Sequence, residues 1–528
     1  MPSAPAPAAP WTAAQRWTVA ATVLGSSMAF IDGSIVNVAL SAVQQSFSAG
    51  VAGSQWVVNA YTLMLAALIL TGGALGDLYG RRRVFGLGVS VFALASVVCG
   101  LAPNLSVLIA ARVLQGVGGA LLIPGSLAMI GAIFDDAGRG RAVGLWSAAT
   151  AATNLLGPVL GGLLVQYLSW RWTFFINIPL ALGVLWCLRG VPETKQGGAQ
   201  QPDLPGSVLA TLGLGLLTYA LIRAGESGGG ASSALTSPAL LGAVGALLLA
   251  GFVAWERAAS APMLPLGLFR GRAFGGVNLL TLLLYAALGA LTFFLPLDLI
   301  GVQGYTPAQA GAALVPLALL LTFLSRPVGG LAGRLGPRLP LTAGPLLCAL
   351  AFALFARPGV GGSYWTTYFP AILVLGLGLS VTVAPLVSAV LGSVDQRYSG
   401  TASGVNNAVS RTGGLLAVAA LGLVMLGGFR GDLAARMKSH DLPPAIVSGV
   451  LAQSDRLAQV QPPPGMSAAS AAQLHRDIGA SFIGGFRQVA WWCAALSLLA
   501  ALVGFGSYTG TGKRSAAQSA GPEAEPPK

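Results

Sequence analysis

Long apolar stretches separated by short polar breaks constrain this chain more than any other feature of its sequence. Each stretch is close to the roughly 20 residues that a helix needs to cross a bilayer. Fourteen such stretches occur, at residues 18–40, 55–76, 84–103, 106–130, 142–166, 172–190, 206–224, 238–255, 274–299, 309–332, 339–356, 366–391, 400–428 and 487–509. The pattern predicts an all-α polytopic membrane protein with 14 transmembrane helices.

Composition supports a membrane location and excludes several other classes of protein. Only 9% of the residues are charged, whereas a soluble chain carries about a quarter. The 73 glycines suit close packing of helices in lipid. The four cysteines lie inside apolar runs, which predicts buried core residues and neither a metal site nor a disulfide framework. The net charge is +13, but the basic residues are scattered between apolar runs, as the positive-inside rule explains. We therefore expect no nucleic-acid partner.

The distribution of basic residues predicts the topology. An even number of spans puts both termini on one side of the membrane, and the arginine-rich connections, such as 81–83, then fall on that side. The short connections on the other side hold only Arg171, Arg223 and Arg357. By the positive-inside rule both termini are cytoplasmic, and the long segment 429–486 is extracytoplasmic. The Pro/Ala-rich start (1–10), the Gly/Ser-rich stretch 225–237 and the tail 511–528 are expected to be unstructured.

The segment 73–83, which reads GALGDLYGRRR, is the most specific local motif. Gly73 and Gly80 allow a tight turn between closely packed helices. Asp77 is an acid at a helix end, where it can pair with an arginine such as Arg81 or face the N-terminus of another helix. The alternative is an ordinary basic loop between two spans.

Other segments carry motifs as well: FIDGSIVNVAL at 30–40, QW at 55–56 with AY at 60–61, ARVLQGVGGA at 111–120, GPVLGG at 157–162 and WRW at 170–172, followed by Asn177 and Pro179. Together with the loop at 73–83, they resemble the major facilitator superfamily, and within it the fourteen-span drug:proton antiporter branch. The resemblance covers nearly the whole chain. The motifs are specific for the superfamily, good indicators of an antiporter and weak indicators of the substrate.

The resemblance implies the major facilitator fold, with two six-helix bundles plus two inserted helices. The expected parts are an N-terminal cytoplasmic tail (1–17), a first bundle (18–190), a linker with two extra transmembrane helices (191–272), a second bundle (273–510) and a cytoplasmic tail (511–528). It further implies a monomeric secondary active transporter in the plasma membrane, not an enzyme. Such a protein uses the proton gradient and no cofactor, and its partners are a small-molecule substrate, protons and the lipid bilayer.

Asp32 is the residue on which we expect proton coupling to depend. A carboxylate at the centre of a span costs about 2.5–3.5 kcal/mol on insertion scales, so its presence indicates function. Arg112 lies about 9 Å into the fourth span, and Asp32 lies about 12 Å from the outer end of the first. The two residues are therefore close in depth, and their contact is a hypothesis. The resemblance implies that Arg112 takes part in proton transfer. The alternatives are that Asp32 is a structural acid paired with a neighbour and that Arg112 only holds helices together.

Two further groups of residues are predicted from the motifs. Gly157, Pro158, Gly161 and Gly162 permit a kink and a close helix contact, so they are candidates for gating, as are Gly73, Asp77, Gly80 and Arg81; packing alone is the alternative. Polar residues in the spans are candidates for the substrate cavity: Asn37, Tyr61, Gln115, Asn406, Asn407 and Arg411. Asp298 lies near the outer end of its span and is expected at the membrane interface.

The sequence thus predicts proton-coupled efflux of hydrophobic or cationic drugs by alternating access. A dedicated exporter of one metabolite or of a self-made antibiotic is the alternative. A membrane enzyme or a non-transporting receptor is more remote, because the two histidines lie outside the spans and the only embedded acids are Asp32 and Asp298. The chain also has no GxxxxGK[ST] loop for ATP.

Overall fold

The computed structural model describes residues 10–195, 201–226, 236–395, 398–439, 444–463 and 466–508. Within these ranges every regular element is a helix. They are α1 (Ala13–Phe47), α2 (Val51–Tyr79), α3 (Arg81–Leu101), α4 (Leu105–Ile133), α5 (Asp136–Tyr167), α6 (Trp172–Phe175), α7 (Asn177–Cys187), η1 (Leu188–Gly190), α8 (Leu204–Gly225), α9 (Pro238–Ala258), η3 (Leu266–Arg270), α10 (Arg272–Gly301), α11 (Pro307–Ala313), α12 (Val315–Leu335), α13 (Arg338–Phe355), α14 (Tyr364–Thr367), α15 (Phe369–Gly392), α16 (Ser399–Lys438), α17 (Pro444–Ala452), η5 (Ser454–Gln459) and α18 (Ala468–Ser507). The segments predicted to be unstructured lie largely outside the described residues.

Thirteen of the described helical segments are long and apolar enough to cross a membrane, and each corresponds to a predicted span. The remaining predicted span, 142–166, is part of α5, in which the described apolar stretch is the shorter Leu156–Tyr167. The sixth span is broken into α6 and α7, and the tenth into α11 and α12. The all-helical membrane fold predicted from the sequence is therefore confirmed.

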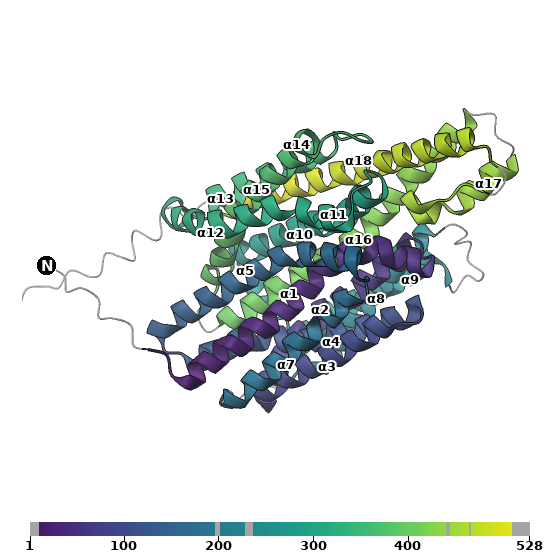
Figure 1. Ribbon diagram of the computed structural model, residues 1–528. Coiled ribbons are helices and arrows are strands. Elements are labelled where there is room, and N and C mark those ends of the chain that lie inside the picture. The colour runs from purple at the N-terminus through teal and green to yellow at the C-terminus, as the bar shows by residue number, and fades with distance from the viewer. Residues whose placement is uncertain are drawn as a thin grey trace, which may run out of the picture.

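The segment 429–486, predicted to be an extracytoplasmic loop with short surface helices, is mostly helical in its described part. The α16 helix continues to Lys438 and α18 already begins at Ala468, so both helices are 40 residues long and extend beyond their predicted spans. Figure 1 shows the two helices projecting together from the bundle, with α17 at their tip. A helix rises about 1.5 Å per residue, so 40 residues span roughly 60 Å, twice the thickness of the hydrocarbon core.

Both described ends of the chain lie at one end of the helix bundle, on the side labelled N in Figure 1. We call this the near end, and the opposite end, where α17 lies, the far end. At the near end Trp17 of α1 packs on Trp186 of α7, with ring centroids 4.7 Å apart. The Arg81 N–H at the start of α3 donates to the Thr194 carbonyl there, at 3.0 Å. The sequence predicts that the near end is cytoplasmic.

The helices pack as two groups and a hairpin. The first group contains α1 to α7, and the second contains α10 to α13, α15, α16 and α18. The inserted helices α8 and α9 pack on each other, and α8 also packs against α2 of the first group and α16 of the second. In Figure 1 the first group fills the lower part of the molecule and the second the upper part.

The two groups are closed against each other at the far end. A Cβ atom at Gly162 of α5 would collide with the carbonyl oxygen of Pro307, and one at Gly311 of α11 would collide with that of Pro158. The groups also meet where α2 packs against α16, and there the Gln55 amide donates to the Val418 carbonyl at 2.6 Å. Small residues therefore let the backbones of the two groups touch.

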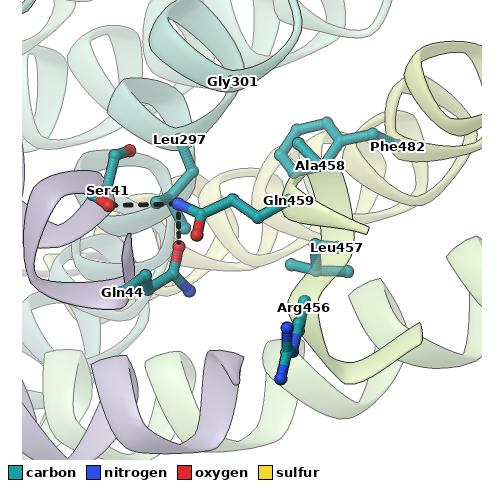
Figure 2. A pocket seen from close by; sticks show the side chains of 9 residues that line it. All are labelled: Ser41, Gln44, Leu297, Gly301, Arg456, Leu457, Ala458, Gln459 and Phe482. Atoms are coloured by element: carbon teal, nitrogen blue, oxygen red, sulfur yellow. Dashed lines mark hydrogen bonds between the residues drawn. The ribbon is translucent and has the colours of Figure 1, made fainter. Parts of the chain in front are cut away.

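The segment between α16 and α18 covers this boundary between the two groups, which we call the seam. Gln459 of η5 donates from Nε2 to the Ser41 carbonyl at 3.1 Å and to Gln44 Oε1 at 3.0 Å, both in α1 (Figure 2). On its other side, η5 lies against the second group, where Leu297 and Phe482 line a small pocket with it. The segment predicted as an extracytoplasmic loop thus bridges both groups at the far end.

Candidate functional site

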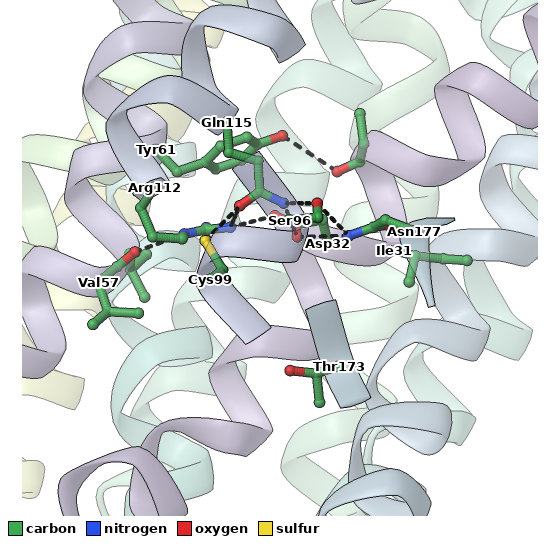
Figure 3. A network of polar contacts seen from close by, with 12 residues as sticks. Ile31, Asp32, Val57, Tyr61, Ser96, Cys99, Arg112, Gln115, Thr173 and Asn177 are labelled. Carbon is green, nitrogen blue, oxygen red and sulfur yellow. Dashed lines mark hydrogen bonds and ion pairs between the residues drawn. The ribbon is translucent and has the colours of Figure 1, made fainter. Parts of the chain in front are cut away.

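Asp32 of α1 lies at the centre of a buried polar network in the first group (Figure 3). Its Oδ2 accepts from Arg112 Nη1 at 2.5 Å. Its Oδ1 accepts from Gln115 Nε2 at 2.7 Å and from Asn177 Nδ2 at 3.1 Å. Asp32 has no exposed surface, so the carboxylate is held by one cation and two amide groups in a water-poor environment. The contact between Asp32 and Arg112, a hypothesis from the sequence, is present.

Arg112 of α4 is 1% exposed and is held from several sides. Its Nε donates to the Val57 carbonyl of α2 at 2.9 Å, and Nη1 also donates to Gln115 Oε1 at 2.7 Å. The guanidinium carbon lies 4.4 Å from the centroid of the Tyr61 ring, within cation–π distance. A buried ion pair is strongly destabilised when one partner is removed, because the other is left uncompensated. The arrangement therefore couples the charge on Asp32 to the position of Arg112.

Glycines of α4 explain how Arg112 and Gln115 reach this depth. A Cβ atom at Gly116 would lie 2.6 Å from the Tyr61 carbonyl oxygen of α2, and one at Gly118 would lie 2.6 Å from the Phe92 nitrogen of α3. The backbone of α4 therefore touches both neighbouring helices. The helix begins at the Asn104 cap, whose side chain accepts from the Val107 N–H at 2.9 Å.

Two members of the network were not predicted as site residues. Asn177 of α7 belongs to a motif noted in the sequence, yet its contact with Asp32 depends on how α7 packs against α1. Ser96 of α3 accepts from Gln115 Nε2 at 2.8 Å and from Asn177 Nδ2 at 3.3 Å. A serine in an apolar span carries little signal in the sequence, because serines in spans commonly bond their own helix.

The predicted cavity residues divide into three sets. Tyr61 and Gln115 belong to the Asp32 network. Asn406 of α16 donates to Asn278 and Thr281 of α10, at 3.1 and 2.8 Å, and so joins two helices of the second group. The remaining three are Asn37, Asn407 and Arg411.

Arg411 lies where the two groups meet. The charge of Arg411 in α16 acts on Tyr61 of the first group and on Tyr285 of the second. Asn407 lies one turn from Arg411 and is exposed. Asn37 Oδ1 is buried and has no hydrogen-bond partner among the described residues. A buried acceptor without a partner is rare and commonly binds water or a ligand.

The near-end loop between α2 and α3 is held by charges. Arg81 donates from Nε to Asp77 Oδ1 at 2.8 Å and from Nη1 to the Ala128 carbonyl of α4 at 3.0 Å. Glu193, which follows the sixth span, accepts from the N–H groups of Arg82 and Arg83 at 3.0 and 3.2 Å. This carboxylate sits at the positive N-terminus of α3. Glu193 was not predicted, because an acid after a span resembles an ordinary loop residue.

Gly80 is required at this loop for its backbone as well as for space. Its φ of +114° is in a region that side chains avoid, and a Cβ atom would lie 2.6 Å from Glu193 Oε1. Gly80→Ala is therefore expected to destabilise the protein by about 1–3 kcal/mol, seen as a lower thermal transition in detergent. Gly131→Ala is the matched control, because nothing lies within 4 Å of a Cβ there. Equal transitions for the two variants would contradict this account of the loop.

The glycine-rich motif of α5, residues 157–162, contacts a helix of each group. A Cβ atom at Gly157 would collide with Ser34 of α1, and one at Gly161 would lie 2.9 Å from the Ile35 carbonyl oxygen. On its other side, Gly162 meets α11, as described above. The glycines of α5 thus let one helix touch α1 of its own group and α11 of the other group at the same time.

Asp298, near the outer end of its predicted span, is fully buried within α10 and its neighbours. Its Oδ2 accepts from the Tyr368 hydroxyl at 2.6 Å, and Gln303 Nε2 lies 3.4 Å from Oδ1. Tyr368 closes over the end of α10 from the start of α15. The side chain is therefore covered by its own group, which depth along one helix does not reveal.

The membrane helices, the seam between two groups and the buried ion pair define a multi-pass membrane transporter. Residues 22–418 match the sequence profile of the Major Facilitator Superfamily. A puromycin resistance protein of Streptomyces alboniger is 36% identical over 82% of this chain and 85% of its own length. The chain therefore belongs to the major facilitator superfamily and is a multi-pass cell-membrane transporter, not an enzyme.

Further relatives are also resistance or export proteins, and a solved transporter shares the fold. The multidrug resistance protein Stp of Mycobacterium tuberculosis (strain CDC 1551 / Oshkosh) is 37% identical over 78% of this chain and 76% of its own length. The tetracenomycin C resistance and export protein of Streptomyces glaucescens is 32% identical over 92% of this chain and 90% of its own. A bacterial homolog of the human lysosomal transporter Spinster, solved inward-facing and unoccupied, has a TM-score of 0.65 at 17% identity, covering 93% of this chain and 98% of that one. That likeness concerns the fold alone.

Proposed function

We propose that this protein exports hydrophobic or cationic drugs in exchange for protons, by alternating access, with Asp32 as the proton-binding carboxylate. The observation that carries the proposal is the fully buried ion pair of Asp32 with Arg112. Removing one charge of such a buried pair leaves the other uncompensated, so a change at Asp32 affects Arg112 strongly. Intramembrane acids of this kind mark proton relays in pumps and transporters.

The proposed cycle uses contacts already described. Protonation of Asp32 removes the charge that holds Arg112, so the guanidinium is free to turn toward other acceptors. Arg112 is also packed on Tyr61, and Tyr61 is within the field of Arg411 across the seam. A change at Asp32 is thereby passed to the surface on which the two groups meet. A cationic substrate that binds beside this network competes electrostatically with the proton.

The far-end contact supplies the other half of the cycle. Closure there depends on the glycines of α5 and α11, whose backbones meet. Opening of this contact would expose the region around Asn37 to the far side. Alternating access then consists of separating the groups at one end while they close at the other.

Relatives that export or resist antibiotics support drug efflux, and their names include both multidrug and single-compound proteins. The second candidate is therefore a dedicated exporter of one metabolite or self-made antibiotic, as in the tetracenomycin C export protein. The proton remains the coupling ion under both candidates.

A substrate screen separates the two candidates. We expect cells that lack their own drug pumps and express this protein to tolerate several chemically unlike compounds, including puromycin and ethidium. Asp32→Asn should return tolerance to the level of cells without the protein. Increased tolerance to a single compound would favour the dedicated exporter, and no increase for any compound would contradict drug efflux.

A further inference from the structure

Two acids lie buried at the near end of the inserted hairpin, away from the Asp32 network. Asp203 precedes α8 and Glu256 lies in the last turn of α9, and they are 8% and 3% exposed. They are brought together because α8 and α9 pack along each other. Acidic side chains are rarely buried to this extent without a cationic partner.

One oxygen of each carboxyl group is satisfied and the other is not. Asp203 Oδ1 accepts from the Gly206 N–H at 2.9 Å and from Trp255 Nε1 at 2.8 Å. Glu256 Oε2 accepts from the Leu264 N–H at 2.9 Å. Asp203 Oδ2 and Glu256 Oε1 are buried and receive no hydrogen from any described residue.

The two unsatisfied oxygens lie beside the same point of the hairpin. A Cβ atom at Gly206 would lie 2.5 Å from Asp203 Oδ2 and 2.8 Å from Glu256 Oε1, so both flank the same point of α8. The negative charge of Asp203 acts on Glu256, as expected for two carboxyl groups this close together. A hydrogen bond between them would need a proton on one of the two oxygens, because two carboxylates offer only acceptors.

Nearby charged groups do not neutralise this pair. Arg257 of α9 and Arg270 of η3 line the adjoining pocket, and neither forms an ion pair with Asp203 or Glu256 in the described part of the chain. On α2, which packs against α8, Asp77 is paired with Arg81 of α3. Two like charges held this close disfavour full ionisation of both groups.

We propose that Asp203 and Glu256 form a second proton-binding site, in which the two carboxyl groups share one proton. The shared proton supplies the hydrogen bond that both unsatisfied oxygens lack. Glu256 lines a pocket of about 830 Å³ at the near end, which gives the proton a route to solution. The site goes beyond the proposed drug efflux and does not depend on Asp32.

Contacts connect this site to the gating loop. The Ser207 hydroxyl donates to the Asp203 carbonyl at 2.7 Å and also contacts the Thr71 hydroxyl of α2. Thr71 lies two residues before Gly73, where the near-end motif begins. Loss of the shared proton sets two negative charges against each other, which separates α8 from α9 and disturbs the Ser207–Thr71 contact. The pH at the near end is thereby transmitted to α2.

Labelling with dicyclohexylcarbodiimide tests the site, because this apolar reagent modifies protonated, buried carboxyl groups. The full-length protein is reconstituted in liposomes, treated over a range of pH and mapped by mass spectrometry. Glu256 should be labelled at neutral pH and progressively less as the pH rises, because the reactive proton is lost. Glu226 of the same hairpin is the matched control: its side chain is 37% exposed and paired with Arg223, so it should remain unlabelled.

Asp203→Asn provides the decisive variant. An amide removes the like charge and offers Glu256 an N–H donor, so Glu256 ionises more readily and its labelling at neutral pH should fall at least about fivefold. Asp203→Ser keeps an oxygen to cap α8 and should give the same loss if the amide variant does not fold. Labelling that is absent at every pH, or unchanged by both variants, would overturn the proposal. Asp32→Asn should leave labelling intact while proton-driven transport is lost, which separates this proposal from the proposed function.

Discussion

Asp32→Asn is expected to abolish proton-driven transport, because asparagine keeps the size of the side chain but cannot gain or lose a proton. In inverted vesicles with an imposed pH gradient, substrate uptake should fall to the level of vesicles without the protein. Exchange of labelled substrate without a gradient should persist, since the seam near Arg411 is unchanged. Full gradient-driven uptake by Asp32→Asn would show that the coupling proton binds elsewhere.

Stability must be separated from coupling in this experiment. Asp32→Asn leaves Arg112 as a buried charge without its partner, which costs about 3–5 kcal/mol. The double variant Asp32→Asn/Arg112→Gln removes that charge, so its thermal transition should recover toward that of the wild type while proton-driven uptake stays absent. Asp432→Asn is a control for loss of an acid, because Asp432 is partly exposed and pairs with Arg436 away from the network.

Gly162→Leu is expected to block transport by holding the far end open. The new Cβ would collide with the Pro307 carbonyl, and a backbone atom cannot turn aside as a side chain does. Overpacking costs about 1–3 kcal/mol, which shifts a two-state equilibrium by about 5- to 150-fold. Reactivity of a cysteine placed at Asn37 toward a membrane-impermeant maleimide from the far side should rise accordingly, while substrate transport falls.

Gly144→Leu is the matched control on the same helix, because nothing lies within 4 Å of a Cβ at that position. It makes the same change of side chain without touching the other group of helices. Normal transport by Gly162→Leu, or an equal rise in reactivity for both variants, would contradict the assignment of the α5–α11 contact as a gate.

The membrane architecture and the similar depth of Asp32 and Arg112 followed from the sequence because both depend on distance along single helices. Apolar runs define spans, and a rise of 1.5 Å per residue places Asp32 and Arg112 at similar depth. The near-end ion pair of Asp77 with Arg81 is likewise local, because the two residues lie four apart on either side of the turn at Gly80.

The features that escaped prediction depend on which helix faces which. Ser96 and Asn177 become members of the Asp32 network only through packing of α3 and α7 against α1 and α4. Asp203 and Glu256 each resemble an acid at a span end, and only the antiparallel hairpin makes them a pair. The length of α16 and α18 was missed because these helices continue beyond the apolar spans into polar sequence, where hydropathy no longer marks them.

Proton release on substrate binding tests the central claim most directly, because it measures the exchange at the binding step itself. The purified protein is held in weakly buffered solution near neutral pH, and a transported cationic compound is added while pH is recorded. Binding to the wild type should release protons, and Asp32→Asn, at equal occupancy by substrate, should release none. Equal proton release by the two proteins, or none by a wild type that binds substrate, would contradict Asp32 as the site of the coupling proton.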